Sequence, residues 1–417
     1  MRRLPRFLSV LPLALLAAQG IAQPQPQPDA TLLAAARAAQ PALLQTLREM
    51  VAIESGTMDA PGLARMLDDA ERRLKAVGAT VERRPGAAAG TPEVLLGRLA
   101  GTGKRRILMM AHLDTIYWPG ALSTQPIKEE GGKLYGPGIA DDKGGAATIL
   151  HALQILQAAG WKDYGQITVL FNADEESGSR GSGALIAQQA AEHDVVLSFE
   201  PTAAPDPGVL LAAAGVAELK LTVKGRAAHA GAAPQLGRNA AIELSHQVLQ
   251  TADIAKGIPG AQLNWTTLSA GKVRNQIPDA AEAGADVRLT APDAADKLLA
   301  AVQAKVAEKK AVPDTEVAVS LNVGRPPFVG DVRTRALAQR AQAIAAELAP
   351  AKPLSLHPIS GGGTDAGFAA QSGKATVLES LGLPGWGYHA RDEYIDIAQV
   401  VPRLYLALRL LVDLGKN

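Results

Sequence analysis

A chain of 417 residues is longer than one ordinary domain, so two domains are expected, and a hydrophobic content of 47% is enough for two cores. The 42 basic and 41 acidic residues leave a net charge of +1, which does not suggest nucleic acid or an anionic membrane surface as a partner. The chain contains no cysteine, which excludes disulfides, cysteine-ligated iron–sulfur clusters and thiol catalysis. Any bound metal ion must therefore be held mainly by histidine and carboxylate side chains.

The N-terminus has the features of a signal peptide over residues 1–22. Three early arginines precede an apolar run at 7–18, and Gly20-Ile21-Ala22 supplies small residues of the kind that a signal peptidase cleaves. A membrane anchor is the alternative, but the apolar run falls short of the roughly 20 residues that a span needs, and no later run is long enough. The Pro/Gln-rich stretch 23–30 predicts a disordered spacer. We therefore expect export to a periplasm or beyond.

Short apolar runs alternate with helical patterns in the next part of the chain and again near its end. The expected buried strands are Arg106–Met110, Ile167–Phe171, Val195–Ser198 and Ala375–Leu378. The expected helices include Gly145–Ala159, Arg335–Leu348 and a closing helix at about Val400–Leu414. Runs buried on both faces and separated by helices predict an α/β fold, a mostly parallel sheet sandwiched by helices. We assign residues 31–212 and 326–417 to this catalytic domain.

The middle of the chain has a different pattern. Its expected strands, which alternate polar and apolar residues, are Val216–Val223, Leu263–Ser269, Ala285–Leu289 and Val317–Val323. Helices are expected near Ala241–Leu249 and Ala294–Glu308. Two helices on a four-stranded, partly exposed sheet make an α+β unit. We therefore predict an inserted lid or dimerisation domain over residues 213–325.

Five short segments carry the residues expected to do chemistry. They are Met110–Asp114, Gly138–Gly144, Asn172–Gly178, Ser198–Pro201 and Gly387–His389. Three of them begin where a buried strand ends, which is where open α/β sheets bind ligands. A lone acid after a strand is usually a helix N-cap, but five segments that each supply a histidine or a carboxylate are hard to explain as caps. A cluster of unpaired carboxylates repels itself unless cations lie between them.

Taken together, these segments resemble the co-catalytic zinc carboxypeptidases and aminoacylases, in particular the bacterial glutamate carboxypeptidases that cleave folates. The resemblance covers nearly the whole chain after the N-terminal segment. It implies two zinc ions per subunit, one bound by His389 and Glu176 and the other by His112 and Glu200, with Asp141 bridging them. It also implies that Glu175 is the catalytic base, that Asp114 orients His112, and that the Asp141–Asp142 peptide bond is cis.

The resemblance extends to the inserted domain and implies a homodimer. His229 resembles the histidine that reaches the neighbouring subunit's zinc site, and Asn275 and Arg288 resemble the residues that hold the substrate's terminal carboxylate. Without the family match, a surface histidine and a surface arginine are the simpler interpretations. The folate-cleaving relatives place a lysine shortly after the segment matching Ser198–Pro201, whereas residues 203–208 contain no cation here. Arg325 is then the candidate for a glutamate side chain.

The sequence thus predicts a zinc-dependent exopeptidase that hydrolyses the amide bond to a C-terminal amino acid, of glutamate type, in N-acyl or peptidyl substrates with a free carboxylate. An aminoacylase or a dipeptidase of the same family is the first alternative, because metal ligands and base are the same in all of them. A non-catalytic periplasmic binding protein is a further alternative, although such a protein would not need the base and every ligand.

Overall fold

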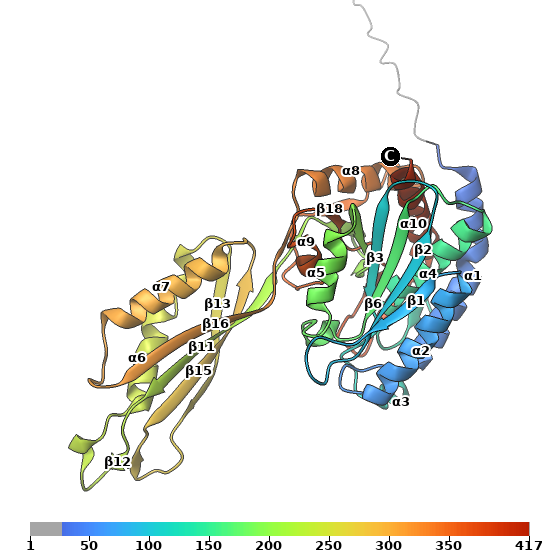
Figure 1. The fold of residues 1–417 in the computed structure, drawn as a ribbon. Coiled ribbons are helices and arrows are strands. Elements are labelled where there is room, and N and C mark those ends of the chain that lie inside the picture. The colour runs from blue at the N-terminus through green and yellow to red at the C-terminus, as the bar shows by residue number, and fades with distance from the viewer. Residues whose placement is uncertain (1–26, 417) are drawn as a thin grey trace, which may run out of the picture.

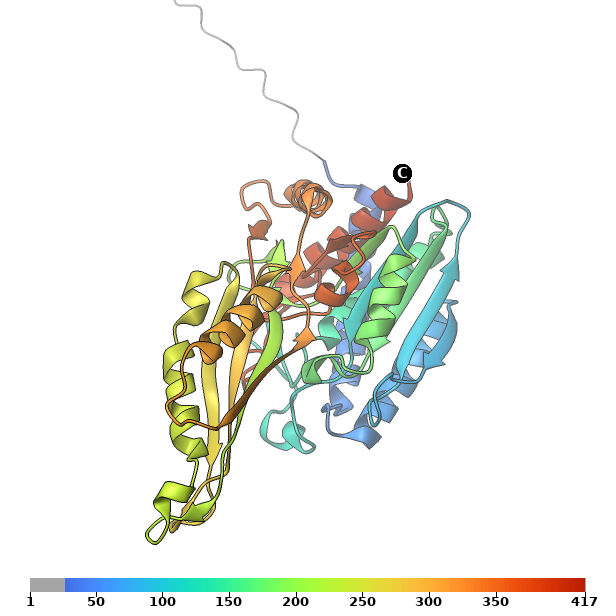
Figure 2. The same ribbon diagram turned by 60° about the vertical axis from the view of Figure 1, so that its left-hand side comes forward.

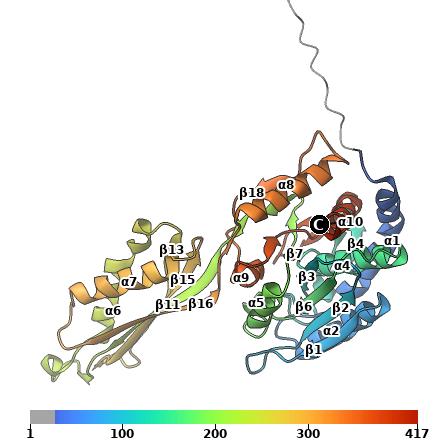
Figure 3. The same ribbon diagram turned by 45° about the horizontal axis from the view of Figure 1, so that its top comes forward.

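The computed structural model describes residues 27–416, which form two bodies of unequal size (Figure 1). The smaller body is inserted between two parts of the larger one. Strand β11 (Gly215–Lys224) leads from the larger body into the smaller one, and β16 (Glu316–Arg325) leads back. Because β11 and β16 are neighbours, the two bodies are joined by the ends of two adjacent strands (Figure 3). Within the described residues, no helix combines the length and apolar character that crossing a membrane requires.

The predicted signal peptide and the first half of the predicted spacer, residues 23–26, lie outside the described residues. The first helix, α1, spans Ala30–Ala52. Asp29 is its N-cap and accepts a hydrogen bond from the backbone N–H of Leu32, while its own backbone N–H donates to the Tyr405 hydroxyl at 2.8 Å. The last residues of the predicted spacer therefore belong to the folded protein, because a helix cap and a contact to the closing helix hold them.

The larger body is built on a six-stranded sheet with the order β1-β2-β6-β3-β7-β19. Its strands are β1 (Thr80–Arg84), β2 (Val94–Ala100), β3 (Arg106–His112), β6 (Gln166–Asn172), β7 (Val195–Ser198) and β19 (Thr376–Leu378). The four predicted strands are parallel to one another, whereas β1 and β2 add an antiparallel edge. The sheet is therefore mixed. The edge strand β1 has the sequence Thr-Val-Glu-Arg-Arg and is largely polar, so it lacks the apolar run that marks the central strands.

Helices cover both faces of this sheet, as Figure 1 shows. On one face lie α1, α2 (Ala60–Ala76), α4 (Lys143–Ala158), α8 (Val332–Ala346) and α10 (Val400–Gly415), and on the other α5 (Gly183–Ala191) and α9 (Ala366–Ala370). Along β3, Ile107 and Met109 pack against the face covered by α1, α4 and α10. Leu108 and Met110 pack against the face covered by α5 and α9, and all four side chains are almost fully buried. Burial on both faces explains why the central strands are continuously apolar.

A smaller five-stranded sheet, in the order β4-β5-β21-β20-β8, lies beside the main one. It consists of β4 (Lys128–Glu130), β5 (Lys133–Tyr135), β8 (Thr202–Ala203), β20 (Pro384–Trp386) and β21 (Tyr394–Asp396), with the short helix α3 (Ala121–Thr124) preceding β4. Short strand pairs β9 (Gly208–Leu210) with β18 (Ser355–His357) and β10 (Ala212–Ala213) with β17 (Phe328–Val329) complete the body. The turn between β20 and β21 carries His389, so this sheet positions one candidate ligand.

The inserted body is a four-stranded antiparallel sheet with helices on one side. Its strands, in the order β13-β15-β11-β16, are β11 (Gly215–Lys224), β13 (Ala261–Ala270), β15 (Ala280–Leu289) and β16 (Glu316–Arg325). Helices α6 (Ala240–Thr251) and α7 (Ala294–Glu308) pack on the same face (Figure 2). The short pair β12 (Ala228–His229) and β14 (Gln276–Ile277) forms the far tip. The predicted fold class, an α/β body with a separate antiparallel α+β unit, is confirmed.

Candidate active site

Three of the candidate residues follow neighbouring strands of the main sheet. His112 is the last residue of β3 and pairs with Asn172, the last residue of β6, while β7 lies on the other side of β3. Glu175 and Glu200 come shortly after β6 and β7. Because the carboxyl ends of parallel strands meet at one edge of a sheet, these side chains converge there.

Asp141 lies between two histidines, and each of its carboxylate oxygens faces one of them. The distance from His112 Nε2 to Asp141 Oδ1 is 2.9 Å, and from His389 Nε2 to Asp141 Oδ2 it is 3.4 Å. His112 Nε2 is also 3.8 Å from Glu200 Oε1, and His389 Nε2 is 3.2 Å from Glu176 Oε2. The five side chains thus form two groups that share one aspartate, which is the arrangement that two bridged metal ions require.

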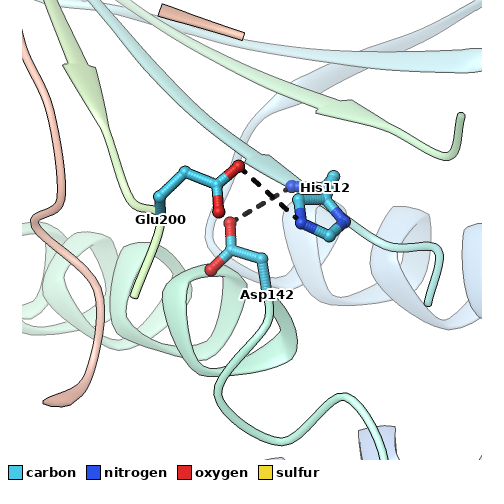
Figure 4. A group of neighbouring side chains, drawn as sticks. All are labelled: His112, Asp142 and Glu200. Atoms are coloured by element: carbon cyan, nitrogen blue, oxygen red, sulfur yellow. Dashed lines mark hydrogen bonds and ion pairs between the residues drawn. The ribbon is translucent and has the colours of Figure 1, made fainter. Parts of the chain in front are cut away.

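Asp142 also approaches this cluster, and Figure 4 shows it beside His112 and Glu200. Its peptide bond to Asp141 is cis, as predicted. Both of its carboxylate oxygens accept backbone hydrogen bonds, one from His112 at 3.3 Å and one from Gly145 at 3.2 Å. Asp142 is fully buried and caps α4, so we interpret it as an anchor of the cluster rather than as a ligand.

Asp114 connects His112 to the two glutamates that follow β6. Its Oδ1 lies 3.3 Å from Nδ1 of His112, and the backbone oxygen of Asp114 is 3.0 Å from the same nitrogen. The backbone N–H groups of Glu175 and Glu176 each donate to its carboxylate at 3.1 Å, and the Thr57 hydroxyl donates at 2.7 Å. One buried carboxylate therefore fixes the orientation of a candidate ligand and the loop of the candidate base.

The charges of the cluster agree with a cation site. Burial alone lowers the pKa of His112, but the carboxylates around it, first of all Glu200, outweigh burial and raise that pKa well above its usual range. Hydrogen bonds to Asp141 and Glu176 raise the pKa of His389 to about 10. Burial raises the pKa of Glu176 and of Glu200. Acids crowded in this way attract protons or metal ions, and two histidines with three carboxylates fit zinc.

Glu175 is buried beside the cluster and forms an ion pair with Arg325, with 2.6 Å between Oε1 and Nη1. Burial raises the pKa of Glu175 well above its usual range, and Arg325 acts against this shift. Arg325 is only 7% exposed and also donates to the backbone oxygens of Gly363 and Glu175. The guanidinium of Arg325 thus holds Glu175 in place. It does not present free donors to the glutamate side chain of a substrate, which is the role that the sequence suggested for Arg325.

A buried glutamate that the sequence did not single out holds the loop of Asp141. Glu393 accepts hydrogen bonds from the backbone N–H groups of Gly138 (2.9 Å), Ala140 (2.8 Å) and Asp141 (3.1 Å), and from the Tyr117 hydroxyl (2.7 Å). Burial raises its pKa to about 7. Glu393 lies in a run with Arg391 and Asp392 that looks like an exposed turn, so no local pattern distinguishes it.

The variant Glu393→Gln is expected to weaken metal binding about 10- to 100-fold, because an amide cannot accept all four donors and the loop of Asp141 shifts. Competition with a chelating indicator measures this affinity. The matched control is Glu347→Gln, which removes a half-buried carboxylate that is bonded to Tyr405 and Arg409, far from the cluster along the chain. It should reduce thermal stability without changing metal affinity. Equal affinities for both variants and the native protein would contradict a positioning role for Glu393.

A cleft of about 1040 Å³ opens in front of the cluster and is lined by both bodies. The larger body contributes candidate ligands and Glu175, and the sheet of the smaller body contributes Arg288 from β15. His229 and Asn275 do not line this cleft. They lie next to each other at the tip around β12, where the backbone N–H of Ala230 donates to the backbone carbonyl oxygen of Asn275 at 2.9 Å.

Two histidines and three carboxylates at one sheet edge, with a buried acid beside them and an open cleft in front, characterise a metal-dependent hydrolase. Comparison with known sequences narrows the class. The profile of "Peptidase family M20/M25/M40" matches residues 108–413, and the chain therefore belongs to this family. The predicted enzyme class, a metallo-carboxypeptidase of this family, agrees with that relationship.

Individual relatives support the assignment. The chain is 44% identical over 408 residues to "Carboxypeptidase G2" of Pseudomonas sp. (strain RS-16), which covers 98% of this chain and 97% of that protein. It is 30% identical over 335 residues to "Succinyl-diaminopimelate desuccinylase" of Xanthomonas euvesicatoria pv. vesicatoria (strain 85-10), and this match covers 75% of this chain and 86% of that protein. The fold is similar to that of aminopeptidase PepT from Bacillus cereus ATCC 10987, with a TM-score of 0.71 at 23% identity, covering 90% of this chain and 98% of that one.

Proposed function

We propose that this protein is a carboxypeptidase that hydrolyses the amide bond to a C-terminal residue of glutamate type in N-acyl or peptidyl substrates. The observation that carries the proposal is the pair of histidines on the two oxygens of Asp141, next to the buried Glu175, with Asp141 and His389 lining the cleft. The name of the 44% identical relative, a carboxypeptidase, supports the reaction class.

Two zinc ions per subunit are part of the proposal. His112 and Glu200 would hold one ion, His389 and Glu176 the other, and Asp141 both, in agreement with the contacts of these side chains. When bound, such ions polarise the scissile carbonyl and lower the pKa of water. Cobalt or manganese also suits histidine and carboxylate ligands.

The side chains around the cluster have distinct roles in this reaction. Glu175 takes the proton from the attacking water and delivers it to the leaving amine, for which its raised pKa is suited. Arg325 fixes the carboxylate of Glu175 through the ion pair. Asp114 fixes His112 through its Nδ1. These contacts hold the base and the ligands in one geometry before substrate arrives.

The terminal carboxylate of the substrate is assigned to Arg288 and Asn275, and the developing oxyanion to His229. Because Asn275 and His229 do not line the cleft of their own chain, both would act from the second subunit of a homodimer. His229 Nδ1 accepts from the backbone N–H groups of Gly231 (3.2 Å) and Ala232 (3.0 Å). The neutral ring therefore carries its proton on Nε2, where it can donate to an oxyanion.

A dimer is supported by the outer edge of the inserted sheet. Strand β13 is one of the two edge strands of this sheet, and Leu268 on it is 56% exposed. On the nearby helix α6, Leu249 is 77% exposed and Ile242 55%. An open strand edge with apolar residues is suited to pairing with a second copy.

Aminoacylase or dipeptidase activity is the second candidate, because the metal ligands and the base are identical. A hydrolysis screen of the zinc-loaded protein separates these functions. We expect N-acyl and peptidyl substrates with C-terminal glutamate to be cleaved faster than those with apolar C-terminal residues. Faster cleavage of free dipeptides, or of simple N-acetyl amino acids regardless of side chain, would favour the second candidate.

The variant Arg288→Ala is expected to lower kcat/KM about 10- to 100-fold for substrates with a free terminal carboxylate, through loss of a charge-assisted hydrogen bond. Arg288 is paired with Asp286 at 2.9 Å but lines the cleft. Methyl-ester analogues should be poor for the native enzyme and lose little more in the variant. Equal losses for acid and ester would instead assign Arg288 to the fold.

Export to the periplasm or beyond is also proposed, on the basis of the arginines and the apolar run 7–18 at the N-terminus. Mass determination of the mature protein tests it. Cleavage near Ala22 is the expected result, and a full-length protein recovered only from the cytoplasm would contradict it.

A further inference from the structure

The cleft contains three arginines, of which two already have carboxylate partners. Arg288 is paired with Asp286, and Arg325 with Glu175. Arg180 also lines the cleft and is exposed, and within residues 27–416 it has no hydrogen bond or ion pair. Among these three arginines, Arg180 is the one whose guanidinium has no carboxylate partner in the described residues, so an anion from outside the protein need not displace one.

The backbone of Arg180 is held firmly although its side chain is free. Arg180 follows the candidate ligand Glu176 in the loop between η1 (Glu175–Ser177) and α5. On one side of it the Ser179 hydroxyl donates to Asp365, and on the other the backbone N–H of Gly181 donates to Asp174 at 2.6 Å. Because the backbone is already fixed, the loop loses little conformational entropy when the Arg180 side chain binds a ligand.

We propose that Arg180 binds the side-chain carboxylate of an acidic residue at the C-terminus of the substrate and so determines a preference for glutamate. This inference rests on the proposed carboxypeptidase function. A C-terminal glutamate brings two carboxylates into the cleft, and Arg288 is assigned to only one of them. A guanidinium is suited to the second, because it can donate two parallel hydrogen bonds to a carboxylate.

Other positions do not offer this cation. Residues 203–208, which lie between the cleft residues Pro201 and Leu210, contain no lysine or arginine. Arg325 is nearly buried and donates to Glu175 and to backbone oxygens. The remaining neutral polar residues that line the cleft, such as Thr267 and Ser360, bear no charge to balance a carboxylate.

An alternative partner for Arg180 lies on the inserted domain. Glu218 on β11 is exposed and lines the same cleft, and its side chain has no hydrogen bond or ion pair within residues 27–416 either. If the two bodies approached each other, Arg180 and Glu218 could pair and close the cleft over any substrate. Such a latch would affect all substrates equally, whereas a carboxylate subsite affects only acidic ones. This difference decides between them.

The test compares two substrates that share one acyl group and differ only in a C-terminal glutamate or glutamine, which have nearly the same shape. For Arg180→Gln we expect kcat/KM to fall about 10- to 100-fold with the glutamate substrate and to stay within about twofold with the glutamine substrate. Arg180→Lys should restore part of the preference. In the native enzyme the preference should weaken as salt rises, because the subsite is exposed.

Two control variants complete the experiment. Glu218→Gln should leave the glutamate-to-glutamine ratio unchanged, and so should Arg37→Gln, which removes an exposed arginine on α1 without a partner in the described residues. If Arg180→Gln and Glu218→Gln slow both substrates equally, Arg180 is part of a latch and the subsite is refuted. An unchanged ratio in Arg180→Gln also refutes it. If the native enzyme cleaves neither substrate, the proposed function itself fails.

Discussion

Replacing Glu175 with glutamine is expected to reduce kcat about 10²–10⁴-fold while leaving the metal content of the protein unchanged. Glutamine has nearly the same shape, and its amide oxygen can still accept a hydrogen bond from Arg325, which lies 2.6 Å from the native carboxylate. It cannot take a proton from water. The variant therefore removes the base and preserves the fold around it.

Metal analysis by mass spectrometry, together with initial rates, measures both effects. The matched variant is Glu176→Gln, which alters the adjacent residue and replaces the carboxylate that lies 3.2 Å from His389 Nε2 with a neutral amide. It should lose metal affinity as well as activity. Loss of metal from Glu175→Gln would mean that Glu175 is a ligand, and a rate close to native would mean that another group accepts the proton.

The central part of the fold could be predicted because burial leaves a strong signal. Strands β3, β6, β7 and β19 pack between two layers of helices, so nearly every residue in them is apolar. Strand β1 could not be predicted in this way, because it pairs only with β2 and lies at the polar edge of the sheet. Residues 80–84 are recognised as a strand only from their pairing with β2 and not from their own composition.

The core of the candidate site could also be predicted, because its residues follow directly after those strands. His112, Glu175 and Glu200 need only the parallel arrangement of β3, β6 and β7 to converge. The metal ligand and base roles themselves stay predictions. Glu393 could not be found, because its four hydrogen bonds come from positions far away in sequence, at Tyr117 and in the loop of Asp141.

Arg180 could not be predicted either. In the sequence it is one of 42 basic residues, and only the structure distinguishes an arginine that lacks a partner in the cleft from Arg288 and Arg325, which have one. Placing Arg325 beside Glu175 likewise required the return of the chain from the inserted domain to the main sheet. Which guanidinium of the cleft lacks a carboxylate partner thus depends on pairing within the inserted body for Arg288 and between the two bodies for Arg325.

Two inactive variants, Glu175→Ala and His229→Ala, are expected to complement each other, so that dimers with one subunit of each variant regain activity. The reason is the position of His229, which lies at the tip of the inserted domain and does not line the cleft of its own chain. If the histidine acts in the partner's site, a mixed dimer has one site with both lesions and one site with an intact base and an intact histidine.

Random exchange of equal amounts makes about half of the dimers mixed, and one of the two sites in each is intact, so activity should recover to about a quarter of native. The measurement is to refold the two variants together and to assay the mixture against each variant alone, with different affinity tags that confirm exchange. As a control, Glu175→Ala mixed with Asp141→Ala should not recover, because both residues act in the same chain's site. If tagged mixed dimers form and the first pair also stays inactive, His229 acts within its own chain or has no part in the reaction.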